Sequence, residues 1–240
     1  IVTATRVARE WPPDNQRVRQ ALTSSAMPTC PARFVRFAIG ASLMALACTT
    51  SDAPADTAAS TPSATSVSSP ADDYLAALRS HCDKAYEGRL IDPQPADSAM
   101  RGQRLVMHVR GCGDTVRIPF HVGEDRSRTW VLTRTAEGVR LKHDHRHADG
   151  TPDAVTMYGG DSRVPGTAVR QEFPVDAGSV AMFEREGLKA SVANTWAMEI
   201  EPGTRLRYEL ARPDGGLFQV EFDLSAPVEP PPAPWGDEAG

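Results

Sequence analysis

The sequence predicts a mostly β domain: an antiparallel meander barrel or sandwich of about nine or ten short strands with two short helices. Many short segments alternate apolar and polar residues, as strands with one buried face do. Tight-turn sequences such as Gly111-Cys112-Gly113-Asp114 and Glu137-Gly138 separate these segments. Only two stretches, 74–81 and 177–186, have helical periodicity next to a capping residue.

Composition limits the classes of partner. The chain has 240 residues and a net charge of -5, with 31 acidic and 26 basic side chains. This balance argues against a nucleic-acid partner, which requires a basic surface. No apolar run has the roughly 18–20 residues of a membrane-spanning helix.

The segment that begins at Met27 has the layout of a secretory signal. Arg33 and Arg36 precede an apolar stretch, 37–47, and small residues lead to Cys48. We therefore expect translation to begin at Met27. Residues 1–26 are then an over-called upstream extension, that is, sequence assigned to the protein by placing its start too far upstream. Residues 27–48 are then the signal peptide.

The end of this signal resembles the lipobox of bacterial lipoproteins. Ala45-Leu46-Ala47-Cys48 matches it except at Ala45, where the family usually has leucine, so an ordinary signal peptide is the alternative. The resemblance implies lipidation of Cys48, a membrane partner through the lipid anchor, and export. Because Thr49 rather than aspartate follows Cys48, it also implies the outer membrane, facing the periplasm.

Three further regions follow from composition. Residues 49–71 are rich in Ser, Thr, Ala and Pro without an apolar pattern, which predicts a disordered tether. Residues 72–225 form the single β-rich domain. Residues 226–240 form a proline-rich tail, which is either a ligand for a proline-binding module or a strap across its own domain, with Trp235 as an apolar anchor. We expect the strap.

Caps define the two helices. Asp72 or Asp73 is the expected N-cap of a helix from Tyr74 to about His81. Asp176 is the expected N-cap of a helix to about Glu186, which Gly187 ends. The apolar positions of the second helix include Val180 and Phe183.

The strands follow from alternation and turns. A hairpin centred near Ala136-Glu137 predicts that Trp130 faces His143 and that Leu132 faces Leu141. Gly159-Gly160 is expected to lie in a turn. The expected strands are 86–91, 105–109, 116–122, 130–134, 139–147, 155–158, 169–173, 192–200, 206–210 and 218–224.

This order of helix, strands and helix resembles the layout of lipocalins. The likeness covers architecture only, because Tyr86-Glu87-Gly88 lacks the tryptophan that lipocalins have after the glycine.

Cys82 and Cys112 are the two cysteines of the β-rich region. An even pair in an exported domain is most simply a disulfide. It would connect the first helix to the first hairpin.

His143, His145 and His147 share one face of a predicted strand and continue the apolar positions Val139 and Leu141. Imidazoles at this spacing can bind zinc, copper, nickel or iron. Three of them span about 13 Å along a strand, so His147 could join only through a bulge. The reserve ligands are Asp149, Asp153 and His121. The alternative, which we favour, is that His143 stacks on Trp130 while His145 and His147 line a polar strand end.

Arg140, Lys142, Asp144 and Arg146 share the opposite face. We expect a solvated ladder of paired charges, and the alternative is an anion site that includes Arg140 and Lys142. Trp130, Arg140 and Lys142 are thus the candidate ligand-binding residues.

No nucleophile elbow, phosphate loop or paired-carboxylate motif is present in the sequence. We therefore expect a non-enzymatic envelope lipoprotein that binds a small molecule or another envelope component. The alternative is a transition-metal-binding protein, such as a metallohydrolase, built on His143, His145 and His147.

Overall fold

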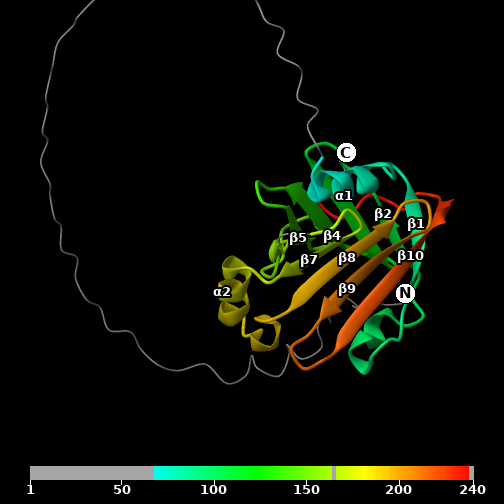
Figure 1. Ribbon diagram of the computed structural model, residues 1–240. Coiled ribbons are helices and arrows are strands. Elements are labelled where there is room, and N and C mark those ends of the chain that lie inside the picture. The colour runs from blue at the N-terminus through cyan, green and yellow to red at the C-terminus, as the bar shows by residue number, and fades with distance from the viewer. Residues whose placement is uncertain (1–67, 164–165, 238–240) are drawn as a thin grey trace, which may run out of the picture. The chain divides into compact units, whose positions relative to one another are not determined.

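The domain is a nearly closed antiparallel barrel of ten strands (Figure 1). The computed structural model describes residues 68–163 and 166–237. The expected signal peptide, Cys48 and all but the end of the tether lie outside these residues. The fold class expected from the sequence is confirmed, and the arrangement is a barrel rather than a sandwich. The strands are β1 (Ala85–Leu90), β2 (Leu105–His108), β3 (Thr115–Val122), β4 (Asp125–Arg134), β5 (Val139–His145), β6 (Tyr158–Asp161), β7 (Arg170–Pro174), β8 (Thr195–Glu201), β9 (Arg205–Ala211) and β10 (Leu217–Val228).

Strand order explains the closure. Every strand pairs with its neighbours in sequence except at β6 and β7, and β1 also pairs with β10, so the sheet runs from β6 through β1 and β10 to β7. The expected hairpin register is confirmed, because Trp130 pairs with His143 and Leu132 pairs with Leu141. Val116, Ile118, Phe120 and Val122 are buried as their alternation predicted.

The seam between β6 and β7 is the one interruption of the sheet ladder among the described strands. Two backbone hydrogen bonds cross it, from Asp176 N to Gly159 O at 2.8 Å and from Arg163 N to Glu172 O at 2.9 Å. A Cβ on Gly160 would lie 1.8 Å from the carbonyl oxygen of Pro174. The expected turn at Gly159-Gly160 is therefore wrong, since both residues lie in β6 and their missing side chains allow neighbouring backbones to approach.

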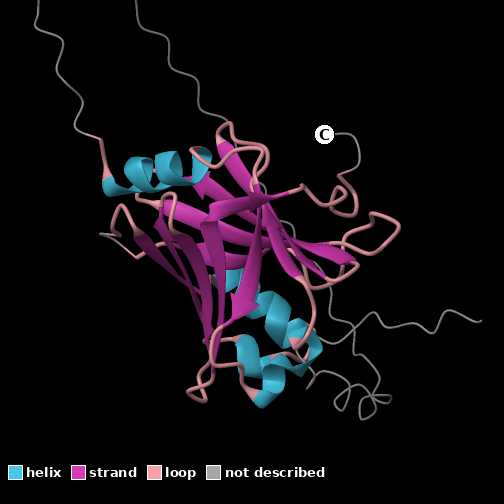
Figure 2. Ribbon diagram, turned by 90° about the vertical axis from the view of Figure 1, so that its right-hand side faces the viewer, coloured by secondary structure: helices cyan, strands magenta, loops and turns pink. Residues whose placement is uncertain are grey.

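Helix α1 (Pro70–Arg79) lies across one end of the barrel (Figure 2). Its N-cap is Ser69 in a capping box with Asp72, so the expected cap at Asp72 or Asp73 is wrong. The buried Tyr74 hydroxyl donates to Met198 O at 3.4 Å. The predicted disulfide is confirmed, because Cys82 after the helix is bonded to Cys112 in the β2–β3 turn.

The opposite end carries the other helical segments: η2 (Pro95–Met100), α2 (Ala177–Arg185) and η3 (Lys189–Ser191). Asp176 caps α2 by accepting from Ser179 N, and Gly187 follows the helix with φ of +76°, both as expected. Phe183 is buried as predicted, but Met182 rather than Val180 is its buried partner. None of the helices in residues 68–163 and 166–237 has the length and apolar character needed to cross a bilayer.

The C-terminal segment begins later than the expected boundary at 226. Strand β10 continues past a bulge, so Pro227 pairs with Tyr86 on β1. Beyond the strand, the tail lies along the start of β4, with Arg126 Nη1 donating to Ala233 O at 2.8 Å. Trp235 N donates to Arg126 O at 3.1 Å. The expected strap across the domain is confirmed for the described part of the tail.

Large aromatic side chains fill the barrel. Trp130 stacks on Phe120 at a centroid distance of 5.0 Å and on Tyr208 at 4.4 Å. Trp196, Phe173 and the other interior rings are almost fully buried. Ten strands enclose a wider space than eight, and these rings occupy most of it.

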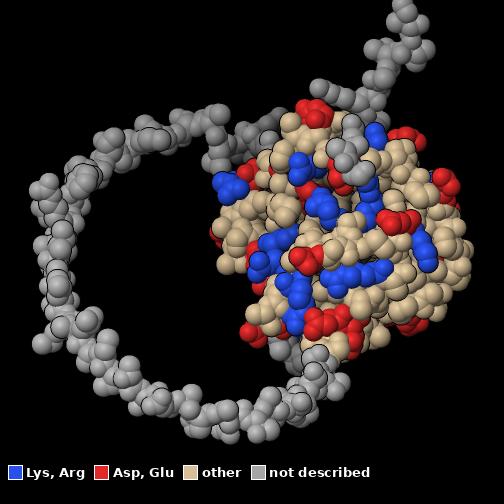
Figure 3. Space-filling model, turned by 90° about the horizontal axis from the view of Figure 1, so that it is seen from above, with Lys and Arg blue, Asp and Glu red and all other residues tan. Residues whose placement is uncertain are grey.

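On the face seen from above, acidic and basic side chains lie next to one another (Figure 3). Charges also pair along the sheet, where Arg205 pairs with Glu199 and Arg207 pairs with Glu221 across β8, β9 and β10. Such interspersed charges are typical of a solvated sheet face.

Candidate functional site

A narrow pocket enters the barrel at the end opposite α1. It lies where β4, β6 and β10 begin and β5 ends, beneath η2. Its cavity volume is about 30 Å³, enough for roughly one or two water molecules. The lining residues are Met100, Phe120, Arg128, Thr129, Trp130, His143, His145, Tyr158, Tyr208 and Phe218.

His143 is a fixed element of this pocket. It is 3% exposed, and its Nδ1 lies 3.1 Å from the carbonyl oxygen of Tyr158. A carbonyl can only accept, so Nδ1 carries the proton and Nε2 is the acceptor. The Tyr208 hydroxyl, 2.8 Å away, therefore donates to Nε2. Both ring nitrogens are engaged, and the imidazole is held in one tautomer.

The packing of His143 differs from the expectation. Its ring stacks on Tyr158, at 4.7 Å and 12° between planes. Trp130, its backbone partner, instead stacks on Phe120 and Tyr208. The predicted stacking of His143 on Trp130 is therefore wrong. Strand β5 pairs with β6 as well as with β4, and the β5–β6 ladder places Tyr158 opposite His143. The stacking partner of His143 therefore comes from its other neighbouring strand.

His145 is the next residue on the same face of β5, two positions after His143, and is half-buried. Its Nε2 is 3.0 Å from the Tyr158 hydroxyl. Its Nδ1 has no hydrogen-bond partner in the described part of the chain. Tyr158 thus joins the two histidines, since its carbonyl holds His143 and its hydroxyl holds His145.

These surroundings keep both imidazoles neutral. Burial, opposed in part by the hydrogen bond to Tyr158 O, lowers the pKa of His143 to about 3. Burial and the nearby Arg128 charge lower the pKa of His145 to about 3. Burial also raises the pKa of Tyr158 and Tyr208 above the usual range of a phenol. These four side chains are therefore uncharged at neutral pH.

Arg128 is the functional candidate that sequence reasoning missed. It pairs with His145 in the β4–β5 ladder and lines the same pocket. Its Nη1 donates to Asp125 Oδ2 at 2.6 Å, whereas its buried Nε has no hydrogen-bond partner. The available signal was the strand period, because Arg128 lies two residues before Trp130 and so shares its inward face.

The third histidine is separated from the other two. His147 lies beyond the end of β5 and is half-exposed, with Nδ1 3.8 Å from Asp153 Oδ2. The reserve ligand Asp149 accepts from Thr151. Another, His121, is buried on β3. Within residues 68–163 and 166–237, no group of three or more His, Cys, Asp or Glu side chains is placed to hold a metal ion.

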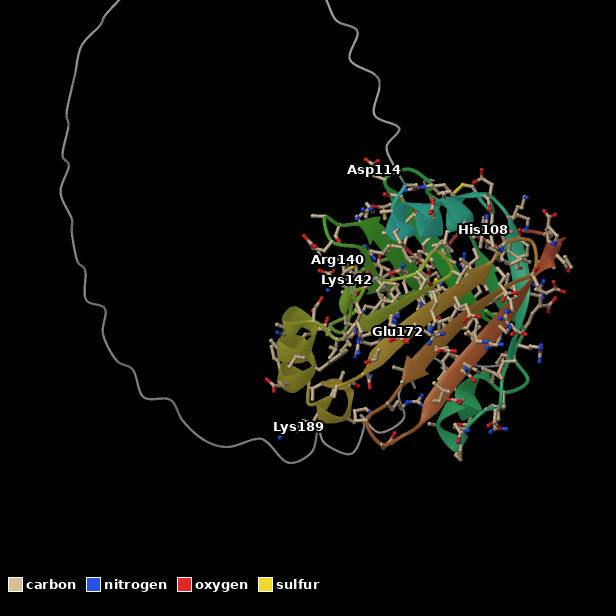
Figure 4. The ribbon with its side chains drawn as sticks, in the orientation of Figure 1. His108, Asp114, Arg140, Lys142, Glu172 and Lys189 are labelled. Atoms are coloured by element: carbon tan, nitrogen blue, oxygen red, sulfur yellow. A yellow bond between two sulfur atoms is a disulfide. The ribbon has the colours of Figure 1, made fainter. Side chains whose placement is uncertain are left out.

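The candidate binding residues Trp130, Arg140 and Lys142 do not come together. Trp130 faces the barrel interior, whereas Arg140 and Lys142 lie on the outside of β5 (Figure 4). Arg140 makes a bidentate pair with Asp161, at 2.5 and 2.8 Å, and Lys142 pairs with Asp176. This outer face is a ladder of paired charges.

The buried carboxylate of the same face, Asp144, is held by two guanidinium groups. Arg117 Nη2 and Arg146 Nε each lie 2.9 Å from an Asp144 oxygen. These hydrogen bonds outweigh the effect of burial and lower the pKa of Asp144. Asp144 therefore cross-links β3 to the end of β5, which carries His145 into the pocket.

Comparison with known proteins adds little. No family model matches the chain, and no curated protein matches it. One solved structure, that of a redesigned beta barrel, mFAP1, bound to DFHBI, is similar over 61% of this chain and 97% of that chain, with 7% identity and a TM-score of 0.23. A TM-score this low supports no conclusion on fold or function. The observed barrel with an interior pocket is itself compatible with a small-molecule-binding module.

Proposed function

We propose that this chain is an exported envelope lipoprotein whose barrel binds a small molecule, without catalysing a reaction. The lipobox-like segment that ends at Cys48 supports the anchor, and the predicted tether 49–71 would hold the barrel clear of the membrane. The Cys82–Cys112 disulfide suits an oxidising compartment. The expected location is the outer membrane, facing the periplasm.

One observation carries the binding proposal. Polar side chains of Arg128, His145 and Tyr158 converge on a pocket whose remaining lining is mostly aromatic or apolar. Binding sites for small molecules have this composition: apolar walls with a few placed polar groups. Helix α1 lies across the opposite end of the barrel, so a ligand would enter at the pocket end, beside η2.

The size of the pocket restricts the ligand. A cavity of about 30 Å³ is far below the roughly 300–1,000 Å³ of sites for drug-sized molecules. A lipid or a long acyl chain would need rearrangement of the aromatic core. The ligand is therefore a compact molecule of a few heavy atoms, or a larger one that inserts only its polar head.

The test is recovery of the ligand. Protein extracted from its native envelope without denaturation should show, by native mass spectrometry, a small-molecule adduct that is lost on unfolding. Met100→Trp, which fills the pocket, should remove the adduct, whereas Leu217→Trp at an exposed position should retain it. A ligand-free native protein, or an adduct unaffected by Met100→Trp, would exclude this function.

The anchor is tested separately. Palmitate labelling should mark the wild-type chain, and Cys48→Ala should abolish the label. Equal, unlabelled secretion of both forms would favour an ordinary signal peptide.

The second candidate function is transition-metal binding. It is favoured by the placement of His143 and His145 on one pocket wall, because neutral imidazole is a ligand for zinc, copper, nickel and iron. His143 would have to release Tyr158 O or Tyr208 to bind a metal. Elemental analysis of the natively extracted protein separates the candidates, since a stoichiometric metal would favour this one.

A further inference from the structure

We propose that the pocket recognises the carboxylate group of a small organic acid, and that this carboxylate binds the Nε–Nη2 edge of Arg128. This inference deepens the proposed function and rests on it, because it assigns a ligand class to the same pocket.

The first support is the incomplete pairing of Arg128. Nη1 donates to Asp125 Oδ2 at 2.6 Å, which fixes the position of the guanidinium. Nε is buried and has no partner, and no described residue accepts from Nη2. The Nε atoms of Arg205 and Arg207 are also unpaired, but of the three arginines only Arg128 lines the pocket. A buried donor without a partner costs stability, so the chain retains here a group that a ligand could satisfy.

The second support is how the same edge is used elsewhere in the molecule. Arg140 places Nε and Nη2 on the two oxygens of Asp161, at 2.5 and 2.8 Å. Arg146 places the same two nitrogens on Asp144, at 2.9 and 3.3 Å. In both pairs this edge binds a carboxylate, in the geometry for which the guanidinium fork is suited. At Arg128 the edge is preserved but no protein carboxylate occupies it.

The third support is the absence of a competing acceptor. Asp125 is the carboxylate nearest to Arg128 in sequence, and both its oxygens are engaged, Oδ2 by Arg128 and Oδ1 by Ser127 N at 2.9 Å. These contacts outweigh the effect of burial and lower the pKa of Asp125, so it remains an anion bound on the Nη1 side.

The remaining walls define the rest of the ligand. His145 and Tyr158 offer uncharged polar atoms beside Arg128. Met100, Phe120 and Phe218 supply apolar contact, and methionine adapts to irregular shapes. A carboxylate with a short apolar body matches both this lining and the small volume.

The experiment compares acetate with acetamide, which have nearly the same shape but differ in charge. Binding to the full chain is measured by saturation-transfer NMR in carboxylate-free buffer at pH 7.5. We expect acetate to bind at least about tenfold more tightly than acetamide, as for a charge-assisted pair. Arg128→Lys keeps a charge beside Asp125 but removes the paired Nε and Nη2 donors of the guanidinium. This variant should weaken acetate binding about tenfold or more. Arg140→Lys, on the outer face, should leave acetate binding unchanged.

Three results would overturn the inference: equal binding of acetate and acetamide, equal acetate affinity in wild type and Arg128→Lys, and no acetate binding at all. The first comparison uses wild type only, so it holds even if a variant fails to fold. None of these results removes the proposed function, which depends on the ligand recovered from the native envelope. A recovered neutral ligand, for example, would retain the function and exclude the carboxylate.

Discussion

The hydroxyl of Tyr208 on β9 donates a hydrogen bond to Nε2 of His143 on β5, 65 residues away in the chain, at 2.8 Å. β5 and β9 lie on either side of the β6–β7 seam. This side-chain hydrogen bond therefore crosses the barrel interior and joins the two sides of the sheet that meet at the seam.

This bond should show a measurable coupling. Tyr208→Phe leaves the buried Nε2 of His143 without a donor, and His143→Leu leaves the tyrosine hydroxyl without an acceptor. Each should lower the free energy of unfolding by about 1–3 kcal/mol. The double variant should cost less than the sum, because no unpaired partner remains. As a control, Tyr86→Phe, whose hydroxyl contacts His81, should add independently to Tyr208→Phe. Additive losses for the His143 and Tyr208 variants in urea unfolding would contradict the coupling.

Stability should depend on pH through the buried histidines. The folded pKa of His143 and His145 is about 3, against about 6.5 unfolded. Between these values the unfolded chain binds more protons, so stability is full above pH 6.5 and falls as pH decreases, by about 1.4 kcal/mol per unit for each such histidine. Urea unfolding at pH 6.5 and 4.5 should show this loss. His143→Leu, which removes one of these two groups, should reduce the slope. A flat profile in wild type would contradict the argument.

The seam should not tolerate a side chain at Gly160. A Cβ there would lie 1.8 Å from Pro174 O, so Gly160→Ala must separate β6 from β7. We expect a loss above about 4 kcal/mol or failure to fold. Gly113→Ala is the matched control, because its Cβ would meet nothing within 4 Å. Equal melting temperatures for the two variants would show that the strands can separate without cost.

Reduction of the Cys82–Cys112 disulfide should destabilise the domain. The bond joins residues 30 positions apart, and a loop of that size corresponds to about 3–4 kcal/mol by chain entropy. The thermal midpoint should fall by several degrees on addition of reductant. The Cys82→Ser/Cys112→Ser variant should already melt at the lower temperature and respond no further. Two free thiols in the native protein would contradict the disulfide.

A chelator should leave the melting temperature unchanged at pH 7.5. Both ring nitrogens of His143 are engaged with Tyr158 and Tyr208, so metal binding would have to break a buried hydrogen bond. Melting curves with and without chelator, on wild type and on His143→Ala/His145→Ala, test this. A chelator effect that disappears in the double variant would instead support the metal-binding alternative, since ligands that bind only the native state stabilise it.

Features encoded by neighbouring residues were predictable from the sequence. The alternation from Val116 to Val122, the hairpin register that pairs Trp130 with His143, and the cap at Asp176 all depend on local periods and turn chemistry. The Cys82–Cys112 bond was predictable because only one pairing was available in the domain. These features specify a β meander and the faces of its strands.

Only the tertiary structure determined which side chains those strand faces contact. His143 stacks on Tyr158 rather than on Trp130, because β5 has a second ladder partner, β6, which places Tyr158 opposite it. Barrel closure then brings Tyr208 of β9 to its Nε2. Gly159-Gly160 lies in a strand, since the space occupied by neighbouring backbones is invisible in a local pattern. Arg128 likewise became a candidate binding residue only from the tertiary structure. Its inward direction follows from the strand period, but the unpaired Nε and the aromatic walls around it exist only once the barrel has closed.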